Sequence, residues 1–255
     1  MAIKIMLDAG HYGKYNRSPV LRSYYESDMT WALHLELKKE LEAYGFKVST
    51  TRVDQTKDLG LVARGEKANG YDMFISLHSN AIDGTKNEPI DRVEVFYPLD
   101  GRNGSKALAT AFATGIAKEM SVSAGKTKTK EYSGYPGCEY YGVMRGAQNV
   151  KVPLYFIIEH SFHTNLKAAT WLSDLENLKK LAKLEASIIA EHYGYSKEVI
   201  GDINGDGKVN TVDYTLLKRH VDNQLTKEQL EKADVNKDGK VDAKDYEAIK
   251  ESILK

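Results

Sequence analysis

The sequence predicts an α/β protein with a mostly parallel, twisted sheet flanked by helices, followed by a small domain of two loop-helix repeats. Two observations indicate the first part: short apolar runs alternate with amphipathic helical segments, and several of the apolar runs end in polar side chains. A third observation indicates the second part, because one Asp- and Asn-rich pattern occurs twice after residue 200.

The composition is that of a globular protein, with 255 residues, 42% hydrophobic and 28% charged residues and a formal net charge of zero. A neutral chain gives no support to nucleic-acid binding or to adhesion to an anionic membrane. We expect no membrane span, since no apolar run approaches the roughly 20 residues that a spanning helix needs. A single cysteine, Cys138, excludes an internal disulfide and a Cys-rich zinc site.

The first half of the chain has a strand-helix-strand-helix-strand pattern. Residues 3–8 are expected to form a strand, and periodic apolar positions predict a helix over 28–44 that ends at a capping glycine. Residues 46–51 alternate in polarity as a strand does, residues 59–69 form a second helix, and a third strand ends at His78.

The second half continues the pattern with one interruption. Residues 92–97 read as a strand that could lie at a sheet edge, and the Ala-rich residues 103–120 read as a helix. Over residues 126–145 tyrosines are mixed with glycines and a proline, which indicates a long irregular loop. Residues 154–159 form the last strand, and residues 166–193 supply one or two helices. The composition then changes, so we expect one domain over 1–195, a linker over 196–200 and a second domain over 201–255.

The second domain has the pattern of calcium loops, whose starts are 32 residues apart. Such a loop presents oxygen ligands at alternating positions and has a glycine at its sixth position, here Gly207 and Gly239. We therefore predict a small all-α, EF-hand-like domain that binds two calcium ions. The ligands of the first ion are Asp202, Asn204, Asp206, the Lys208 carbonyl, Asn210 and Asp213, and those of the second are Asp234, Asn236, Asp238, the Lys240 carbonyl, Asp242 and Asp245.

Both loops end in Asp at position 12, and no helical pattern precedes the first loop. In these respects residues 201–255 resemble a type I dockerin, a module that attaches secreted enzymes to a cohesin domain of a scaffold protein. The resemblance implies that cohesin is contacted by Thr211, Val212, Lys218, Arg219, Ala243 and Lys244. Because the two copies differ at these positions, a near-symmetric dual binding mode is not expected. A domain with so little core should need calcium to fold.

The first domain carries a candidate metal site at its predicted strand ends. His11 follows the first strand, His78 ends the third, and Glu159 ends the last. Two imidazoles and one carboxylate form a typical hydrolytic zinc site with an open position for water, and ligands gather at the carboxyl ends of strands in an α/β sheet. The residues alone leave the carboxylate ligand open between Glu26 and Asp28, and leave structural histidines as an alternative.

Four segments match the motifs of one enzyme family, at residues 7–11, at Glu26, at residues 76–81 and at residues 159–165. Residues 3–193 resemble the zinc-dependent N-acetylmuramoyl-L-alanine amidases of the amidase_3 type. The resemblance implies that His11, Glu26 and His78 bind one zinc ion and that Glu159 is the general base and acid. The chain departs from the family pattern at Tyr12 and at His160-Ser161.

The expected reaction is hydrolysis of the amide bond between N-acetylmuramic acid and L-alanine in peptidoglycan, with Arg64 or Asn80 as a candidate oxyanion donor. His160 and His163 are expected to be structural. Two alternatives remain: a catalytically inactive module that binds cell wall, and a zinc peptidase that cleaves within the stem peptide. A dockerin favours a secreted or cell-surface protein, and since Met1 leads directly into the first strand, we expect a signal peptide to have been removed from this sequence.

Overall fold

The computed structural model describes residues 2–82, 89–195, 200–206, 208–219 and 225–254. The chain divides into two compact units, Met1–Gly194 and Tyr195–Lys255, which are described separately. The α/β class predicted for the first unit is confirmed, as is the helical character of the second. No helix in the described ranges has the length and apolarity that a membrane crossing requires.

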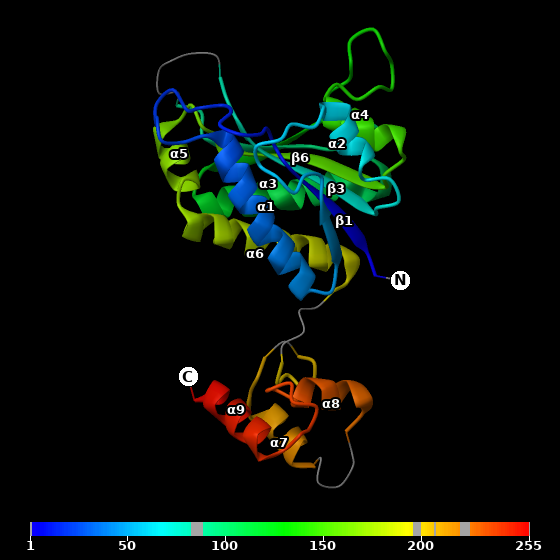
Figure 1. Cartoon of the computed structure of the whole chain (residues 1–255), viewed down its shortest axis with the longest axis vertical. Helices are drawn as coiled ribbons and strands as arrows, with labels where there is room; N and C mark the ends of the chain where they lie inside the picture. Colours follow the sequence, from blue (N-terminus) through cyan, green and yellow to red (C-terminus); the bar gives the residue numbers. More distant parts are fainter. Residues whose placement is uncertain (1, 83–88, 196–199, 207, 220–224, 255) are drawn as a thin grey trace. The chain divides into compact units, whose positions relative to one another are not determined.

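The first unit is built on a twisted sheet, in which β1, β3 and β6 are labelled in Figure 1. The sheet has six strands in the order β2-β1-β3-β6-β4-β5. Neighbouring strands are parallel except at one junction, where β4 runs antiparallel to β6. The strands are β1 (Lys4–Ala9), β2 (Lys47–Thr50), β3 (Met73–Asn80), β4 (Arg92–Phe96), β5 (Ser123–Lys128) and β6 (Leu154–Phe162).

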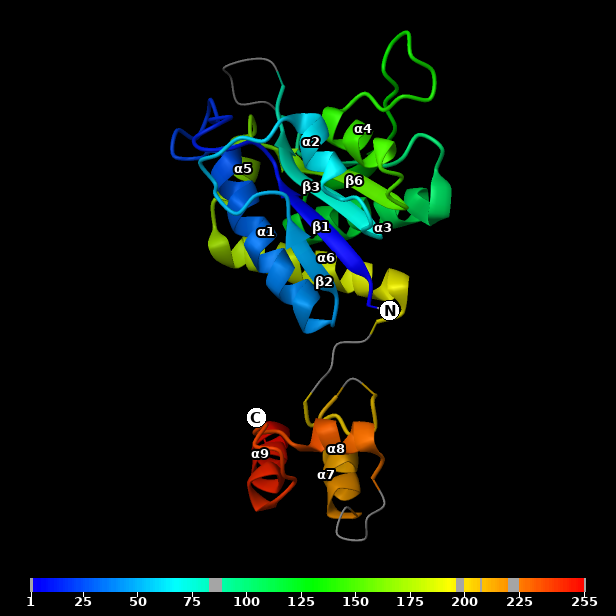
Figure 2. The same cartoon turned by 45° about the vertical axis from the view of Figure 1, so that its right-hand side comes forward.

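Helices cover both faces of the sheet (Figures 1 and 2). One face is covered by three long helices, α1 (Glu26–Ala43), α3 (Ser105–Met120) and α6 (Leu175–Tyr193). The other face is covered by two short helices, α2 (Leu61–Glu66) and α4 (Gly142–Asn149). A 3-10 turn, η1 (Arg102–Gly104), precedes α3, and α5 (Leu166–Leu172) joins β6 to α6.

Side chains along the central strands point alternately to the two faces of the sheet, and this decides which of them can meet at the site. Phe74 of β3 and Ile157 of β6 pack in the core cluster under α4. Because side chains alternate between faces with a period of two, His78 and Glu159 lie on that same face. His160, the next residue along β6, must therefore lie on the opposite face, toward the long helices.

The segment predicted to be irregular, residues 126–145, instead contains the second half of β5 and the first half of α4, so this prediction is wrong in part. Glycines at the contact between α2 and α4 have a packing role. A Cβ atom at Gly146 would lie 2.0 Å from the Val62 carbonyl oxygen, and one at Gly65 would lie 2.0 Å from the Val143 carbonyl oxygen. Glycine thus lets α2 and α4 pack backbone to backbone. Because β5 pairs with β4, β4 is also not an edge strand.

The second unit contains α7 (Thr211–Lys218), α8 (Lys227–Ala233) and α9 (Ala243–Ile253). The helices predicted after the two loops are α7 and α9, whereas α8 was not expected from the sequence. The buried core consists of four small or medium side chains, Ile203, Leu217, Ala233 and Ile249. Gly207 and residues 196–199 of the predicted linker lie outside the described residues.

Candidate metal centre and catalytic site

Three side chains from three separate segments converge at the carboxyl ends of β1 and β3. One possible ligand atom each from His11, Glu26 and His78 lie within 4.8 Å of one another. The His11 and His78 rings meet edge to face, with 5.1 Å between their centroids. Glu26 is the first residue of α1 and is 2% exposed. Of the two carboxylates that the sequence left open, Glu26 is therefore the one at this centre. Asp28 instead accepts a hydrogen bond from Gln55 and pairs with Lys14.

The backbone at the end of β1 is held in an uncommon conformation that presents His11. His11 has a φ of 59°, in the left-handed region that few non-glycine residues occupy. Arg64, which is 2% exposed, donates hydrogen bonds from its guanidinium to the carbonyl oxygens of Ala9 (3.1 Å) and His11 (3.2 Å). Arg64 thus fixes the turn behind the centre, and it does not line the catalytic hollow.

Glu26 is ionised by its neighbours despite its burial. Its Oε1 atom lies 3.0 Å from His78 Nδ1 and accepts a hydrogen bond from the backbone N–H of Ser79 at 2.9 Å. Its Oε2 atom lies 3.1 Å from His11 Nε2. Burial opposes the charged form, but the hydrogen bonds with His11 and His78 hold the pKa of Glu26 well below its ordinary value.

Asn16 is a member of this cluster that sequence reasoning missed. Its side-chain amide donates to Glu26 Oε2 at 2.7 Å and lies 3.0 Å from His11 Nε2. Asn16 has a φ of 51°, a conformation that Asn tolerates better than most residues. In the sequence it is one polar residue in a polar loop, so no pattern distinguishes it.

Glu159 lies beside the three-residue cluster. It pairs with His78 in the register of β3 and β6. Its Oε2 atom is buried and has no hydrogen-bond partner among the described residues. Burial, with the charge of Glu26 as the next cause, raises the pKa of Glu159 to about 8, which suits a group that both takes and returns a proton near neutral pH.

The centre opens into a hollow of about 350 Å³, the catalytic hollow, lined by His11, Asn16, Glu26, Leu61, His78, Ser79, Asn80, Ala81, Tyr141, Gly142, Val143, Ile157, Glu159 and His163. Of the two candidate oxyanion donors, Asn80 therefore lines the hollow. Its amide nitrogen lies 3.2 Å from Glu94 Oε2. His163 also lines the hollow, and its Nδ1 atom lies 3.0 Å from the Ser79 carbonyl oxygen.

His160 lies behind the site, on the other face of the sheet. Its Nε2 atom lies 2.7 Å from Glu185 Oε1 of α6, and its Nδ1 atom lies 2.9 Å from the carbonyl oxygen of His78. His160 and Glu185 are both fully buried. Since both ring nitrogens face oxygen acceptors, the imidazole is held as the doubly protonated cation, which supports the backbone of His78 from behind.

The two loops of the second unit share the hydrogen bonds made by their last aspartate. In the first, Asp213 accepts hydrogen bonds from the backbone N–H groups of Ile203 (2.8 Å) and Asn210 (2.9 Å). In the second, Asp245 accepts from Val235 and Asp242, each at 2.8 Å. The two aspartates are fully buried, and each completes a capping box at the start of the helix that follows.

The other predicted calcium ligands lie in the same two loops. Asp202 accepts from the backbone N–H of Gly205 at 2.8 Å and Asp234 from that of Asp238 at 3.1 Å. The remaining members interact with one another or with loop backbone: Asn204, Asp206, Lys208 and Asn210 in the first loop, and Asn236, Asp238, Lys240 and Asp242 in the second.

The predicted cohesin contacts lie at the helix starts and at the end of α7. Thr211 and Val212 open α7, with Val212 51% exposed, and Ala243 and Lys244 open α9. Lys218 lies over the ring of Tyr214 at 4.7 Å, and the exposed Arg219 caps α7. At the second residue of each helix the two repeats therefore present different chemistry, with the apolar Val212 in the first and the cationic Lys244 in the second.

An α/β sheet at whose strand ends two histidines meet a glutamate from a helix start, with a second, half-buried acid beside them, is typical of metal-dependent hydrolases. The chain belongs to the N-acetylmuramoyl-L-alanine amidase family, whose sequence profile (Amidase_3) matches residues 5–191. Residues 200–254 match the profile of the dockerin type I domain. Both resemblances predicted from the sequence are thereby confirmed, and the chain is a peptidoglycan amidase with a dockerin domain. No curated protein matches the chain.

Solved structures of amidases share the fold of the first unit. An N-acetylmuramoyl-L-alanine amidase from Clostridium difficile 630 has a TM-score of 0.64 at 22% identity, over 76% of this chain and 97% of that one. The catalytic domain of CwlV, from Bacillus (Paenibacillus) polymyxa var. colistinus, has a TM-score of 0.60 at 23% identity, over 76% and 99%. AmiC2 of Nostoc punctiforme has a TM-score of 0.61 at 22% identity, over 75% and 97%.

Proposed function

We propose that the first unit is a zinc-dependent amidase that hydrolyses the bond between N-acetylmuramic acid and L-alanine in peptidoglycan. The observation that carries this proposal is the convergence of His11, Glu26 and His78 on one point beside Glu159, whose buried Oε2 atom has no hydrogen-bond partner among the described residues. Family membership supports the choice of bond.

The three residues fit a zinc ion by donor chemistry. Two imidazoles and one ionised carboxylate are a common ligand set for catalytic zinc, which keeps a fourth position for water or substrate. Asn16 is hydrogen-bonded to Glu26 and lies next to His11, as a residue that orients metal ligands does. We assign one zinc ion to this centre.

When bound, zinc supplies Lewis-acid chemistry by polarising a carbonyl oxygen and making water more acidic. The protein's own groups then handle the proton. Glu159, with its pKa raised by burial, takes a proton from the attacking water and returns it to the amine of L-alanine as that amine leaves. Asn80, which lines the same hollow, is the better-placed candidate of the two proposed oxyanion donors.

The test is a digest of purified peptidoglycan by the full chain, with and without a chelator, analysed by mass spectrometry. The expected products are intact stem peptides with a free L-alanine amine, formed only when zinc is present or restored. Glu159→Gln should retain zinc and lose turnover by at least about 100-fold.

Two outcomes would identify the alternatives. Zinc-loaded protein that binds peptidoglycan and releases no product would indicate an inactive wall-binding module. Products cut within the stem peptide would indicate a zinc peptidase. Full activity of Glu159→Gln would remove Glu159 from the role proposed here.

For the second unit we propose that two calcium ions order the loops and that the ordered module binds a cohesin domain. The two loops offer carboxylate, amide and carbonyl oxygens, which are the ligands that calcium prefers. The exposed Val212 supports a cohesin contact centred on the first repeat. Together with a cell-wall substrate, a cohesin partner implies a secreted or cell-surface protein.

Titration with a type I cohesin in calcium and in EGTA tests this assignment. Val212→Asp should weaken calcium-dependent binding by at least tenfold, whereas Lys244→Asp should have a smaller effect. Equal losses from both variants would contradict a contact centred on the first repeat.

A further inference from the structure

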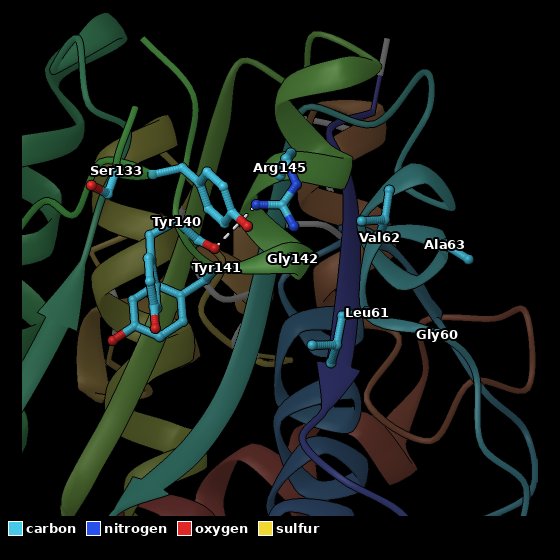
Figure 3. A pocket seen from close by; sticks show the side chains of 10 residues that line it. Gly60, Leu61, Val62, Ala63, Ser133, Tyr140, Tyr141, Gly142 and Arg145 are labelled. Atoms are coloured by element: carbon cyan, nitrogen blue, oxygen red, sulfur yellow. Dashed lines mark hydrogen bonds between the residues drawn. The ribbon is translucent and has the colours of Figure 1, made fainter. Parts of the chain in front are cut away.

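A second hollow, the tyrosine hollow, lies next to the catalytic hollow. Its volume is about 910 Å³, and it is lined by the start of α2, the loop that contains Tyr132, and the start of α4. It shares the lining residues Leu61, Tyr141 and Gly142 with the catalytic hollow, so the two hollows adjoin. Figure 3 shows Arg145 and Tyr140 on one side of it and Leu61 and Val62 of α2 on the other.

Arg145 presents an unused hydrogen-bonding edge in this hollow. Its Nη1 atom donates to the carbonyl oxygens of Glu139 (2.9 Å) and Tyr140 (3.1 Å), and the latter bond is drawn in Figure 3. Its guanidinium carbon lies 5.1 Å from the ring centroid of Tyr132. These contacts fix the group in place, yet neither Nε nor Nη2 donates to any residue that the structure describes. That pair of nitrogens forms the flat edge that binds a carboxylate through two parallel bonds.

The surroundings of the tyrosine hollow are positively charged. The Lys130 ammonium lies 3.7 Å from the ring centroid of Tyr140, and within the described ranges neither Lys130 nor Arg145 is paired with a carboxylate. Burial raises the pKa of Glu139, which disfavours its charge, and it accepts hydrogen bonds from Leu99 N–H and the Tyr155 hydroxyl. Glu131 accepts from the backbone of Gly137 instead of pairing with either cation.

We propose that the tyrosine hollow binds the stem peptide of the substrate and that Arg145 holds the free α-carboxylate of its second residue. This inference rests on the proposed amidase function. In peptidoglycan that residue is a glutamate joined through its side chain, so its α-carboxylate is free. An extended peptide advances about 3.3–3.6 Å per residue, so a carboxylate on the second residue lies up to about 7 Å from the scissile amide, a reach that suits a hollow adjoining the catalytic one. The tyrosines would pack against the aliphatic part of the peptide.

The experiment compares two soluble N-acetylmuramoyl tripeptides that differ at one group, the α-carboxylate of the second residue or the matching carboxamide. The unaltered full chain loaded with zinc should cleave the carboxylate form with a kcat/KM about 10- to 100-fold higher, since a hydrogen-bonded charge pair is lost in the amide. This comparison needs no variant and is independent of any folding defect.

Arg145→Lys keeps the positive charge and removes the pair of nitrogens that can bind a carboxylate in a bidentate way. It should reduce the preference for the carboxylate form to threefold or less, mainly by slowing cleavage of that form. Arg22→Lys is the matched control, because Arg22 is exposed and lines neither hollow. It should keep the full preference.

The outcomes separate this inference from the proposed function. Equal cleavage of both tripeptides by the unaltered chain would overturn the role of Arg145 and leave the amidase assignment intact. A preference set by the number of attached sugars, with no effect of the carboxylate, would assign the tyrosine hollow to the glycan strand and also overturn it. Failure to cleave either tripeptide or whole peptidoglycan would overturn the proposed function itself.

Discussion

Gly10 lies so close to the His78 imidazole that a Cβ atom at position 10 would be 2.5 Å from Cε1 and 2.6 Å from Nδ1 of that ring. The backbone N–H of Gly10 also donates to the carbonyl oxygen of Leu77 at 3.0 Å. The glycine before His11 therefore has a definite task, which is to let the end of β1 approach the second histidine of the centre.

Gly10→Ala should displace the His78 ring and reduce zinc affinity by at least about tenfold, with a loss of stability of about 1–3 kcal/mol from overpacking. Zinc content by elemental analysis and a competition titration with a chelator would measure the effect. Gly115→Ala is the matched control on α3, where the added atom meets only the ends of flexible side chains, Ile188 at 3.1 Å and Leu184 at 3.6 Å. Unchanged zinc affinity in Gly10→Ala would show that His78 is not constrained in this way.

The buried pair of His160 and Glu185 leads to a second prediction. Glu185→Leu removes the partner of a cation that is fully buried, so it should lower the free energy of unfolding by about 3–5 kcal/mol. Both tryptophans, Trp31 and Trp171, lie in the first unit, so their fluorescence during urea unfolding reports on that unit alone.

The double variant His160→Met/Glu185→Leu distinguishes a lost ion pair from a simple packing defect. Replacing both charges by apolar groups should recover at least half of the loss, because no unpaired charge is then left inside. A double variant as unstable as Glu185→Leu alone would indicate that packing, and not charge, is responsible.

The periodicity of apolar residues was sufficient to predict most helices and strands of the first unit. It failed where tertiary contacts override the local sequence pattern. α1, α3 and α6 have regular apolar stripes because each packs one face on the sheet. α4 resembles a loop in the sequence because Gly142 and Gly146 serve contact with α2 and not chain reversal. β5, with the sequence Ser-Ala-Gly-Lys-Thr-Lys, lies at the sheet edge and needs little apolar character.

The residues of the candidate site divide in the same way, into those that local sequence predicts and those that depend on distant contacts. His11, His78 and Glu159 each follow an apolar run, so their meeting at one sheet edge follows from strand geometry. Glu26 could be chosen over Asp28 only through family resemblance, since both lie at the start of one helix. Asn16 and Arg145 come from polar or glycine-rich segments whose folding depends on distant contacts, and local sequence carries no signal for either.

The stability of the first unit should depend on pH through His34, which is 1% exposed on α1. Burial lowers its pKa from 6.5 to about 4, against the opposing effect of a contact with the Trp31 carbonyl oxygen. Between these values the unfolded chain binds more protons than the folded one, so stability falls as pH drops through this window and is regained as pH rises. The full effect is about 3 kcal/mol.

Urea unfolding of the parent chain and of His34→Gln from pH 7 to pH 4 would measure this contribution. The difference in free energy between the two should shrink or reverse in favour of the variant as pH falls, because only the parent must bury an ionisable imidazole. Other acid-sensitive groups, such as Glu94, affect both proteins equally. Parallel curves over the whole range would show that His34 does not cause the acid sensitivity.

Calcium should order the second unit through Asp213 and Asp245 to equal extents. Each carboxylate is fully buried and holds backbone N–H groups at both ends of its loop, so each joins the start of a loop to the helix after it. Without calcium the other carboxylates of the loop repel one another, and a core of four buried side chains gives little compensation. We expect EGTA to abolish protection from hydrogen exchange across 200–254 and to leave residues 2–194 unchanged.

Asp213→Asn and Asp245→Asn should each weaken calcium binding at least tenfold, whereas Glu251→Gln, which removes an exposed carboxylate on α9, should not. Loss of binding in only one of the two loop variants would show that the repeats, alike in their hydrogen bonds, differ in their need for the metal.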